Sequence, residues 1–94
     1  MGEELAQKVK KYKALTKKAL SKISIKKSVS QKEKLVGQDF IEMCKNYFSD
    51  AQYFEKQGDL VNALAALSYA HAWLDAGVRA GIFNAKRDSK LFTL

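Results

Sequence analysis

Apolar residues recur at helical spacing along most of the chain and predict three helices. The most apolar of these stretches lies between Gly58 and Gly81, where apolar side chains cover about half of the helix circumference. That arc is wider than the stripe of roughly 100° that is typical of a helix packed on one side only. We therefore expect residues 60–80 to form a central helix that contacts two neighbours, with Asp59 as its N-cap.

Two earlier segments carry narrower apolar stripes and are predicted to cover the central helix. The first runs from about residue 3 to residue 24, and the second from about residue 31 to residue 57. Ser30 and Glu33 have the spacing of a capping box, in which each side chain bonds a backbone N–H at the start of a helix. Residues 25–30 are rich in β-branched and small polar residues and are interpreted as a connection.

Only Gly58 and Asp59 separate the second helix from the central one, so these two helices must form a tight antiparallel hairpin. In this hairpin we expect Tyr47 to lie near His71. The predicted fold class is all-α, a three-helix up-and-down bundle. No proline-rich or low-complexity linker interrupts the chain, and residues 1–94 are therefore predicted to form one domain.

Residues 82–94 show no sustained periodicity and are predicted to form a C-terminal tail. Within it, Ile82 and Phe83 are expected to cover the end of the bundle. The last four residues, 91–94, are too apolar for a purely solvated segment, so we expect them to pack back on a groove.

The basic character of the chain is concentrated in its first third. The formal net charge is +7, and residues 1–34 contain 11 lysines against only three glutamates. A lysine-covered helix attracts phosphate groups, although the same pattern also occurs as a solvated face, especially in heat-adapted proteins. The candidate phosphate-binding residues on the first helix are Lys8, Lys10, Lys11, Lys13, Lys17, Lys18 and Lys22.

The aromatic content of this helix limits what it could bind. Tyr12 is its only aromatic residue and is expected to face the core, so we expect contact with a nucleic-acid backbone or a folded RNA surface rather than base stacking. Binding to an anionic membrane is not expected, because the apolar side lacks Trp and Phe and is needed by the bundle.

One polar group interrupts the apolar central helix. His71, Asp75 and Arg79 follow one another at intervals of four residues and form a candidate polar site in which His71 and Asp75 could exchange protons. The alternative is a structural role, with His71 bonded to Tyr47 or to a backbone carbonyl. A single histidine and a single cysteine cannot supply a zinc site, and we expect no metal, no cofactor and no enzymatic activity.

The side of the central helix that faces away from the predicted core is also apolar. Its candidate interface residues are Ala65, Tyr69, Ala72 and Ala76. Such a surface is unusual unless something covers it, and the cover could be the tail, the first helix, a protein partner or a second copy of the chain.

The cellular setting is inferred from what the sequence contains. Cys44 is the only cysteine and is expected to be a buried small hydrophobe, which favours a reducing, cytoplasmic location. Charged and polar residues interrupt the central apolar stretch, and the lysine-rich start does not have the pattern of a signal peptide, so no membrane association is expected.

The most distinctive sequence runs of the chain are Ser-Tyr-Ala-His at residues 68–71 and Trp-Leu-Asp-Ala-Gly at residues 73–77. With these runs, the segment from Phe54 to Phe83 resembles a family of small archaeal proteins called domain of unknown function 357. The resemblance implies a three-helix up-and-down bundle in an archaeal cytoplasm, and it supplies no activity, cofactor or site residue. We predict a non-enzymatic protein-interaction or scaffold module. The alternative is a nucleic-acid or ribonucleoprotein accessory that uses the lysines of the first helix.

Overall fold

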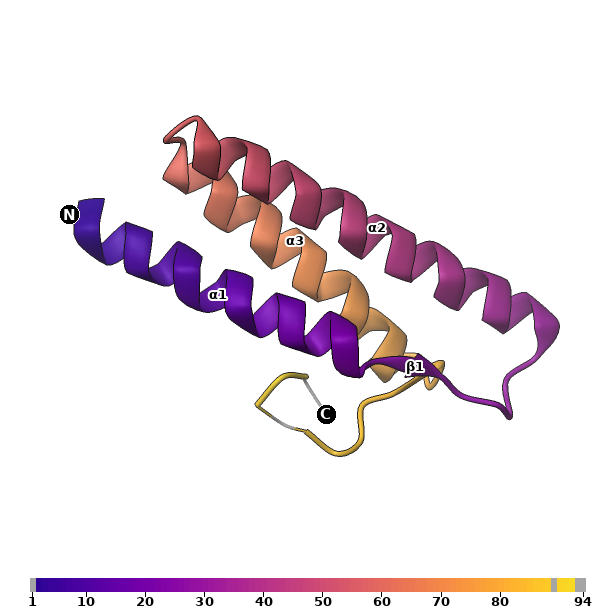
Figure 1. Cartoon of the computed structure of the whole chain (residues 1–94). Coiled ribbons are helices and arrows are strands. Elements are labelled where there is room, and N and C mark those ends of the chain that lie inside the picture. The colour runs from indigo at the N-terminus through magenta and orange to yellow at the C-terminus, as the bar shows by residue number, and fades with distance from the viewer. Residues whose placement is uncertain (1, 89, 93–94) are drawn as a thin grey trace.

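Three helices and one very short sheet make up the computed structural model, which describes residues 2–88 and 90–92. The helices run up, down and up, so the predicted all-α three-helix bundle is confirmed (Figure 1). Each predicted helix agrees with the observed one to within two residues at either end. The elements are α1 (Gly2–Lys22), β1 (Ser24–Ile25), α2 (Gln31–Lys56), α3 (Leu60–Arg79) and β2 (Phe83–Asn84).

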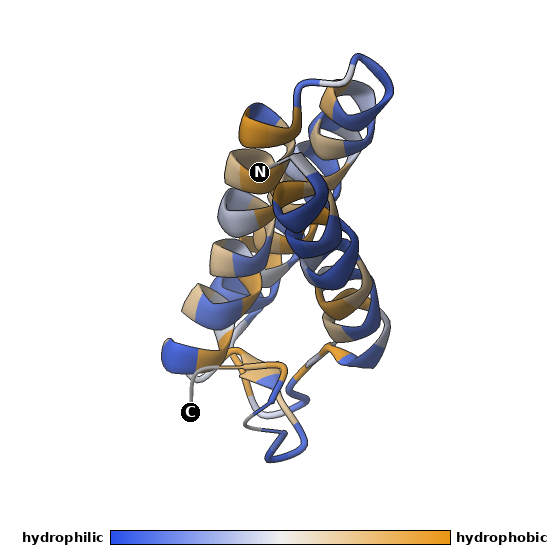
Figure 2. Ribbon diagram, turned by 90° about the vertical axis from the view of Figure 1, so that its left-hand side faces the viewer, coloured by the Kyte–Doolittle hydropathy of each residue, from blue (hydrophilic) through white to orange (hydrophobic). Residues whose placement is uncertain are grey.

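The central position of α3 is the main feature of the bundle. It packs along α2 on one side and along α1 on another, whereas α1 and α2 contact each other very little (Figure 1). Ala63, Ala70 and Leu74 of α3 are completely buried. Figure 2 shows the same contrast in composition, because α3 is coloured mostly as apolar and α1 is largely hydrophilic. The wide apolar arc of α3 thus serves two neighbours.

The helix ends are closed by the side chains that the sequence indicated. Ser30 and Glu33 form both bonds of the capping box at the start of α2. At the start of α3, Asp59 Oδ1 accepts from the backbone N–H of Asn62 at 3.2 Å. Gly58 precedes it with φ 76°, a conformation that costs glycine little. These local contacts fix the tight turn of the α2–α3 hairpin.

The short sheet was not predicted. β1 pairs with β2 antiparallel, with Ile25 opposite Phe83, inside segments that the sequence indicated to be a connection and a tail. The ring of Phe83 then lies against Gly77, where an added Cβ would come within 2.2 Å of it. Ile82 and Phe83 are buried and close the end of the bundle, as expected. Two paired residues are too short to produce a recognisable alternation in a sequence.

Candidate functional site

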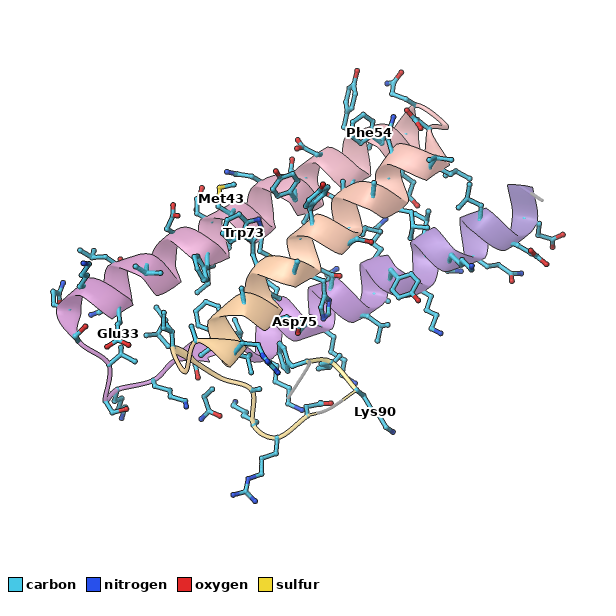
Figure 3. All side chains as sticks on the ribbon, turned by 180° about the vertical axis from the view of Figure 1, so that it is seen from behind. Glu33, Met43, Phe54, Trp73, Asp75 and Lys90 are labelled. Carbon is cyan, nitrogen blue, oxygen red and sulfur yellow. The ribbon has the colours of Figure 1, made fainter. Side chains whose placement is uncertain are left out.

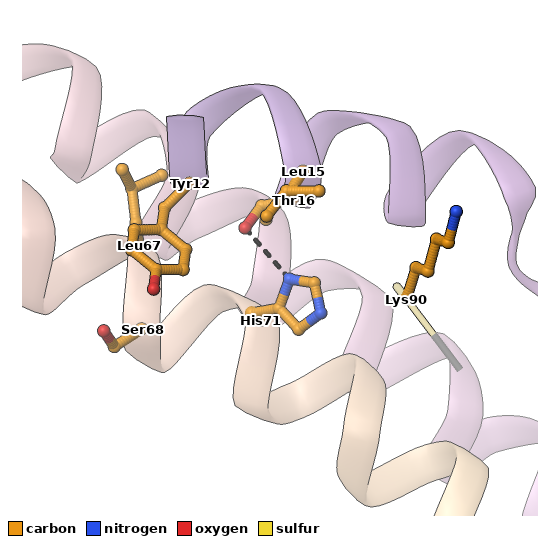
Figure 4. A pocket seen from close by; sticks show the side chains of 7 residues that line it. All are labelled: Tyr12, Leu15, Thr16, Leu67, Ser68, His71 and Lys90. Carbon is orange, nitrogen blue, oxygen red and sulfur yellow. Dashed lines mark hydrogen bonds between the residues drawn. The ribbon is translucent and has the colours of Figure 1, made fainter. Parts of the chain in front are cut away.

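A hydrogen-bonded junction joins α1, α3 and the C-terminal tail. His71 Nδ1 lies 3.1 Å from Thr16 Oγ1 (Figure 4), and His71 Nε2 contacts the backbone oxygen of Leu91. A carbonyl oxygen only accepts, so Nε2 carries a hydrogen. In the neutral ring, Nδ1 therefore accepts from the hydroxyl of Thr16, a residue only 1% exposed. His71 thereby connects three segments that are far apart in the chain.

Of the two structural partners expected for His71, Tyr47 or a backbone carbonyl, the structure has the carbonyl, that of Leu91. Both ring nitrogens of His71 have other partners, and Tyr47 instead stacks on Tyr69 with ring centroids 5.3 Å apart. The hairpin sets which residues of α2 and α3 lie at the same height, but not the direction in which each side chain leaves its helix. At this height His71 points toward α1, whereas Tyr69 and Tyr47 meet along the seam between α2 and α3.

The other members of the predicted polar site continue along α3 from His71. Asp75 is half-buried, and Arg79 is exposed in the last turn. The bond from His71 Nε2 to Leu91 agrees with the structural alternative, in which a backbone carbonyl holds the ring. Thr16 was missed as a partner. Thr16 is a polar residue on the apolar stripe of a predicted helix. Because a buried polar group requires a bonding partner, this pattern could have identified it.

A pocket of about 260 Å³ opens beside this junction, between α1 and α3 (Figure 4). It is lined by Tyr12, Leu15, Thr16, Leu67, Ser68, His71 and Lys90. The expectation that Tyr12 faces the core is wrong, because 44% of this residue is exposed. The reason is that α1 packs chiefly on one helix, rather than into a groove between two, so its apolar stripe is incompletely covered.

Two of the candidate lysines of α1 form ion pairs with other segments, and the others are exposed. Lys13 Nζ lies 2.8 Å from Glu55 Oε1 of α2, and Lys22 Nζ lies 2.7 Å from Asp88 Oδ2 of the tail. The bond from Lys22, together with backbone N–H groups of residues 90 and 91, holds the pKa of Asp88 below its ordinary value. The remaining candidate residues are exposed: Lys8, Lys10, Lys11, Lys17 and Lys18.

The predicted interface residues lie on the side of α3 turned away from α1. Tyr69 is 61% exposed, and the three alanines of this face, at positions 65, 72 and 76, are exposed too. Side chains of α2 extend the surface, and Figure 3 shows Met43, Trp73 and Phe54 along the seam of the hairpin. A second pocket, of about 200 Å³, lies there between α2 and α3. It is lined by Tyr47, Asp50, Phe54, Asn62, Ala65, Ala66 and Tyr69.

The described part of the chain offers little for metal binding, membrane insertion or thiol chemistry. Residues 2–88 and 90–92 contain no group of three His, Cys, Asp or Glu side chains that could hold a metal ion. The helices described within those residues are also not long and apolar enough to cross a membrane. Cys44 is fully buried, and burial raises the pKa of its thiol to about 11. Little reactive thiolate therefore forms near neutral pH.

Comparison with known proteins identifies one family and one solved structure. The family model described as Protein of unknown function (DUF357) matches residues 11–83. The crystal structure of protein AF1782 from Archaeoglobus fulgidus, assigned to the same family model, is similar with a TM-score of 0.71 and 26% sequence identity. The similarity covers 88% of this chain and 95% of that one. No curated protein matches the chain.

Proposed function

Since the chain belongs to the DUF357 family, we propose its function from the surface that it presents: it is a non-enzymatic protein-interaction module. The interface is the side of the α2–α3 hairpin turned away from α1, which we call the open face and define by Tyr47, Ala65, Tyr69, Ala72 and Ala76. The observation that carries the proposal is the exposed ring of Tyr69 among exposed alanines. Water contact with so much apolar surface is unfavourable, and a partner would relieve it.

The shape of the open face favours a helical partner. Alanines let the backbone of another helix approach closely, while the large ring of Tyr69 stands out beside them. Stacking on Tyr47 holds that ring in place, so little conformational freedom is lost when it is buried. A second copy of the chain fits this surface, because each Tyr69 ring would pack on the small residues of the other copy in an isologous dimer.

Sedimentation velocity over a wide range of protein concentrations tests the proposal. The wild type should form dimers, and Tyr69→Glu should be monomeric because it would bury a charge at the centre of the interface. Tyr53→Glu is the matched control, because Tyr53 is 60% exposed on α2 and does not line the pocket of the open face. A monomeric wild type at the highest concentrations, or an equal effect of both substitutions, would show that the open face is not a dimer interface.

The exposed lysines of α1 favour a second candidate function, which is nucleic-acid binding through phosphate contacts. Five of the seven candidate lysines are exposed and make no ion pair with described residues. Fluorescence anisotropy with duplex DNA, single-stranded DNA and structured RNA tests this candidate at low and high salt. Binding should weaken steeply with salt and be lost in a Lys10→Glu, Lys17→Glu variant.

A double variant on another helix provides the control for that measurement. Lys45→Glu with Lys56→Glu changes the net charge by the same amount at exposed positions of α2. Equal loss of binding in both double variants would indicate attraction by total charge rather than by the α1 face. The Lys13 side chain is left unchanged in this design, because its removal would also break the contact with Glu55.

A further inference from the structure

We propose that the pocket between α1 and α3 binds a nucleotide unit, with the base against Tyr12 and the phosphates on the lysines at either side. The pocket lies on a different side of the molecule from the open face. The inference is therefore independent of the proposed protein interface. The inference deepens the second candidate function, which is nucleic-acid binding. It rests on that function only where the bound nucleotide is part of a strand.

The apolar part of the pocket suits a planar ring. Tyr12 lies at one end with much of its ring accessible, and Leu15 and Leu67 supply the aliphatic surface beside it (Figure 4). An exposed tyrosine on a basic helix is the arrangement on which nucleic-acid bases stack, since every base has an aromatic face. The sequence had indicated no base stacking because Tyr12 is the only aromatic residue of the first helix and was expected to face the core; the exposed ring changes the second of these grounds.

The polar part of the pocket supplies hydrogen-bonding groups at its edge. The hydroxyl of Ser68 donates to the backbone oxygen of Leu64 at 3.1 Å, so its oxygen is still able to accept a hydrogen bond from a ligand. Thr16 and His71 are bonded to each other and form a fixed wall. A base, which carries N–H donors on its rim, fits a pocket with an apolar face and an acceptor at the edge.

Lysine side chains lie on both sides of the part of the pocket that would hold the base. Lys11 Nζ lies 5.8 Å from the centre of the Tyr12 ring. Lys90 reaches the opposite end of the pocket from the tail and forms no ion pair with the described residues (Figure 4). Lys8 is one helical turn before Tyr12 and is exposed. A nucleotide in a strand has a phosphate on each side, which matches cations at both ends.

The size of the pocket limits the ligand. Its volume of about 260 Å³ is slightly below the range of roughly 300–1,000 Å³ that drug-sized ligands occupy. A single base fits within it, and the sugar and phosphates would lie toward the lysines at its edge. The same chemistry is offered by a free nucleotide and by an unpaired nucleotide of a single strand. A base within a duplex is excluded because its faces are already stacked.

Nuclear magnetic resonance titrations of the ¹⁵N-labelled full chain test the inference. The probes are adenosine monophosphate, inorganic phosphate, a short single-stranded oligoadenylate and an abasic strand of the same length. Adenosine monophosphate or the oligoadenylate should shift the backbone amides of Leu67 and Ser68 in the pocket, whereas the two probes without bases should shift at most the amides of the α1 lysines. Tighter binding of the oligoadenylate would identify a strand as the source, and equal or tighter binding of the mononucleotide would identify a free nucleotide.

Substitutions in the pocket provide the second part of the test. Tyr12→Leu should weaken binding by about 5- to 100-fold, the range expected for loss of one stacked base, whereas Tyr12→Trp should retain it. Tyr53→Leu removes an exposed tyrosine of α2 and should change nothing. Lys90→Gln should weaken binding and reduce its salt dependence.

Three results would overturn the inference. The first is equal binding of the abasic strand and the oligoadenylate, which would leave phosphate attraction by α1 intact but exclude a base in the pocket. The second is unchanged affinity in Tyr12→Leu. The third is the absence of saturable shifts with every probe, in which case the nucleic-acid candidate also fails.

Discussion

The α2–α3 hairpin and α1 are attached to the bundle in different ways. The hairpin has capped helix starts, a three-residue turn at residues 57–59 and a long seam with paired rings, such as Phe40 and Trp73 with centroids 5.1 Å apart. In contrast, α1 packs on α3 almost alone and is joined to other segments by individual polar contacts. Those contacts are Thr16 with His71, Lys13 with Glu55, and Lys22 with Asp88.

The hairpin and α1 are therefore held in place by different kinds of side-chain contact. Apolar area is removed from water along the whole hairpin, and no single contact decides its geometry. For α1, a lysine-rich helix whose like charges repel, a few bonds fix where it lies. We therefore expect substitutions in the hairpin to affect the whole molecule and substitutions at the α1 contacts to loosen α1 first.

The largest effect should come from Leu74→Ala in the centre of α3. Leu74 is completely buried, so the substitution should lower the free energy of unfolding by about 2–5 kcal/mol. Urea unfolding followed by circular dichroism measures it. Leu35→Ala, at a position 56% exposed on α2, should change stability by less than about 0.5 kcal/mol. Similar costs for the two variants would contradict the central role of α3.

Thr16→Val should separate α1 from the hairpin. Valine keeps the shape of threonine but leaves Nδ1 of His71 without its partner, at a cost of about 1–3 kcal/mol. Hydrogen exchange should show loss of protection in α1 while α2 stays protected. Thr16→Ser keeps the hydroxyl and should preserve the protection of α1. Uniform loss across all three helices in Thr16→Val would argue against a locally held α1.

Acid should loosen the C-terminal tail. The pKa of Asp88 is lowered in the folded protein, chiefly by the hydrogen bond from Lys22. The stability from this contact is therefore present above the unfolded pKa of about 3.9 and is lost as the pH falls through the lower folded pKa. Amide resonances of residues 88–92 should shift in that range. Asp88→Asn should abolish the transition, and its persistence would assign it to another group.

The smallest effect should follow from Lys13→Gln. The contact with Glu55 is partly exposed, so its loss should cost about 0.2–1 kcal/mol. High salt should reduce the difference from the wild type, because it screens the pair. Lys10→Gln, at an exposed position of the same helix, is the control and should be neutral or slightly stabilising. A salt-independent cost at Lys13 would indicate packing of its aliphatic stem instead.

The sequence predicted the helices well because their apolar residues keep a strict period and their ends carry capping residues. It also indicated the family, which the match over residues 11–83 confirms. It did not predict the pairing of Ile25 with Phe83, because two-residue strands have no period. The positions of Tyr12 and His71 depend on how α1 and the tail cover α3. Those contacts join residues far apart in the chain, 55 positions for Thr16 and His71 and 20 positions for His71 and Leu91, and no local pattern records them.

The attachment of α1 to α3 and the tail has a consequence for synthesis. α1 is synthesised before α3 and the tail, and the surface that it covers is completed only by residues 71–92. At roughly 5–20 residues per second, the roughly 70 positions between Lys22 and Phe92 take on the order of 4–14 s to translate. Until α3 has been made, the apolar stripe of α1 lacks the helix on which it chiefly packs.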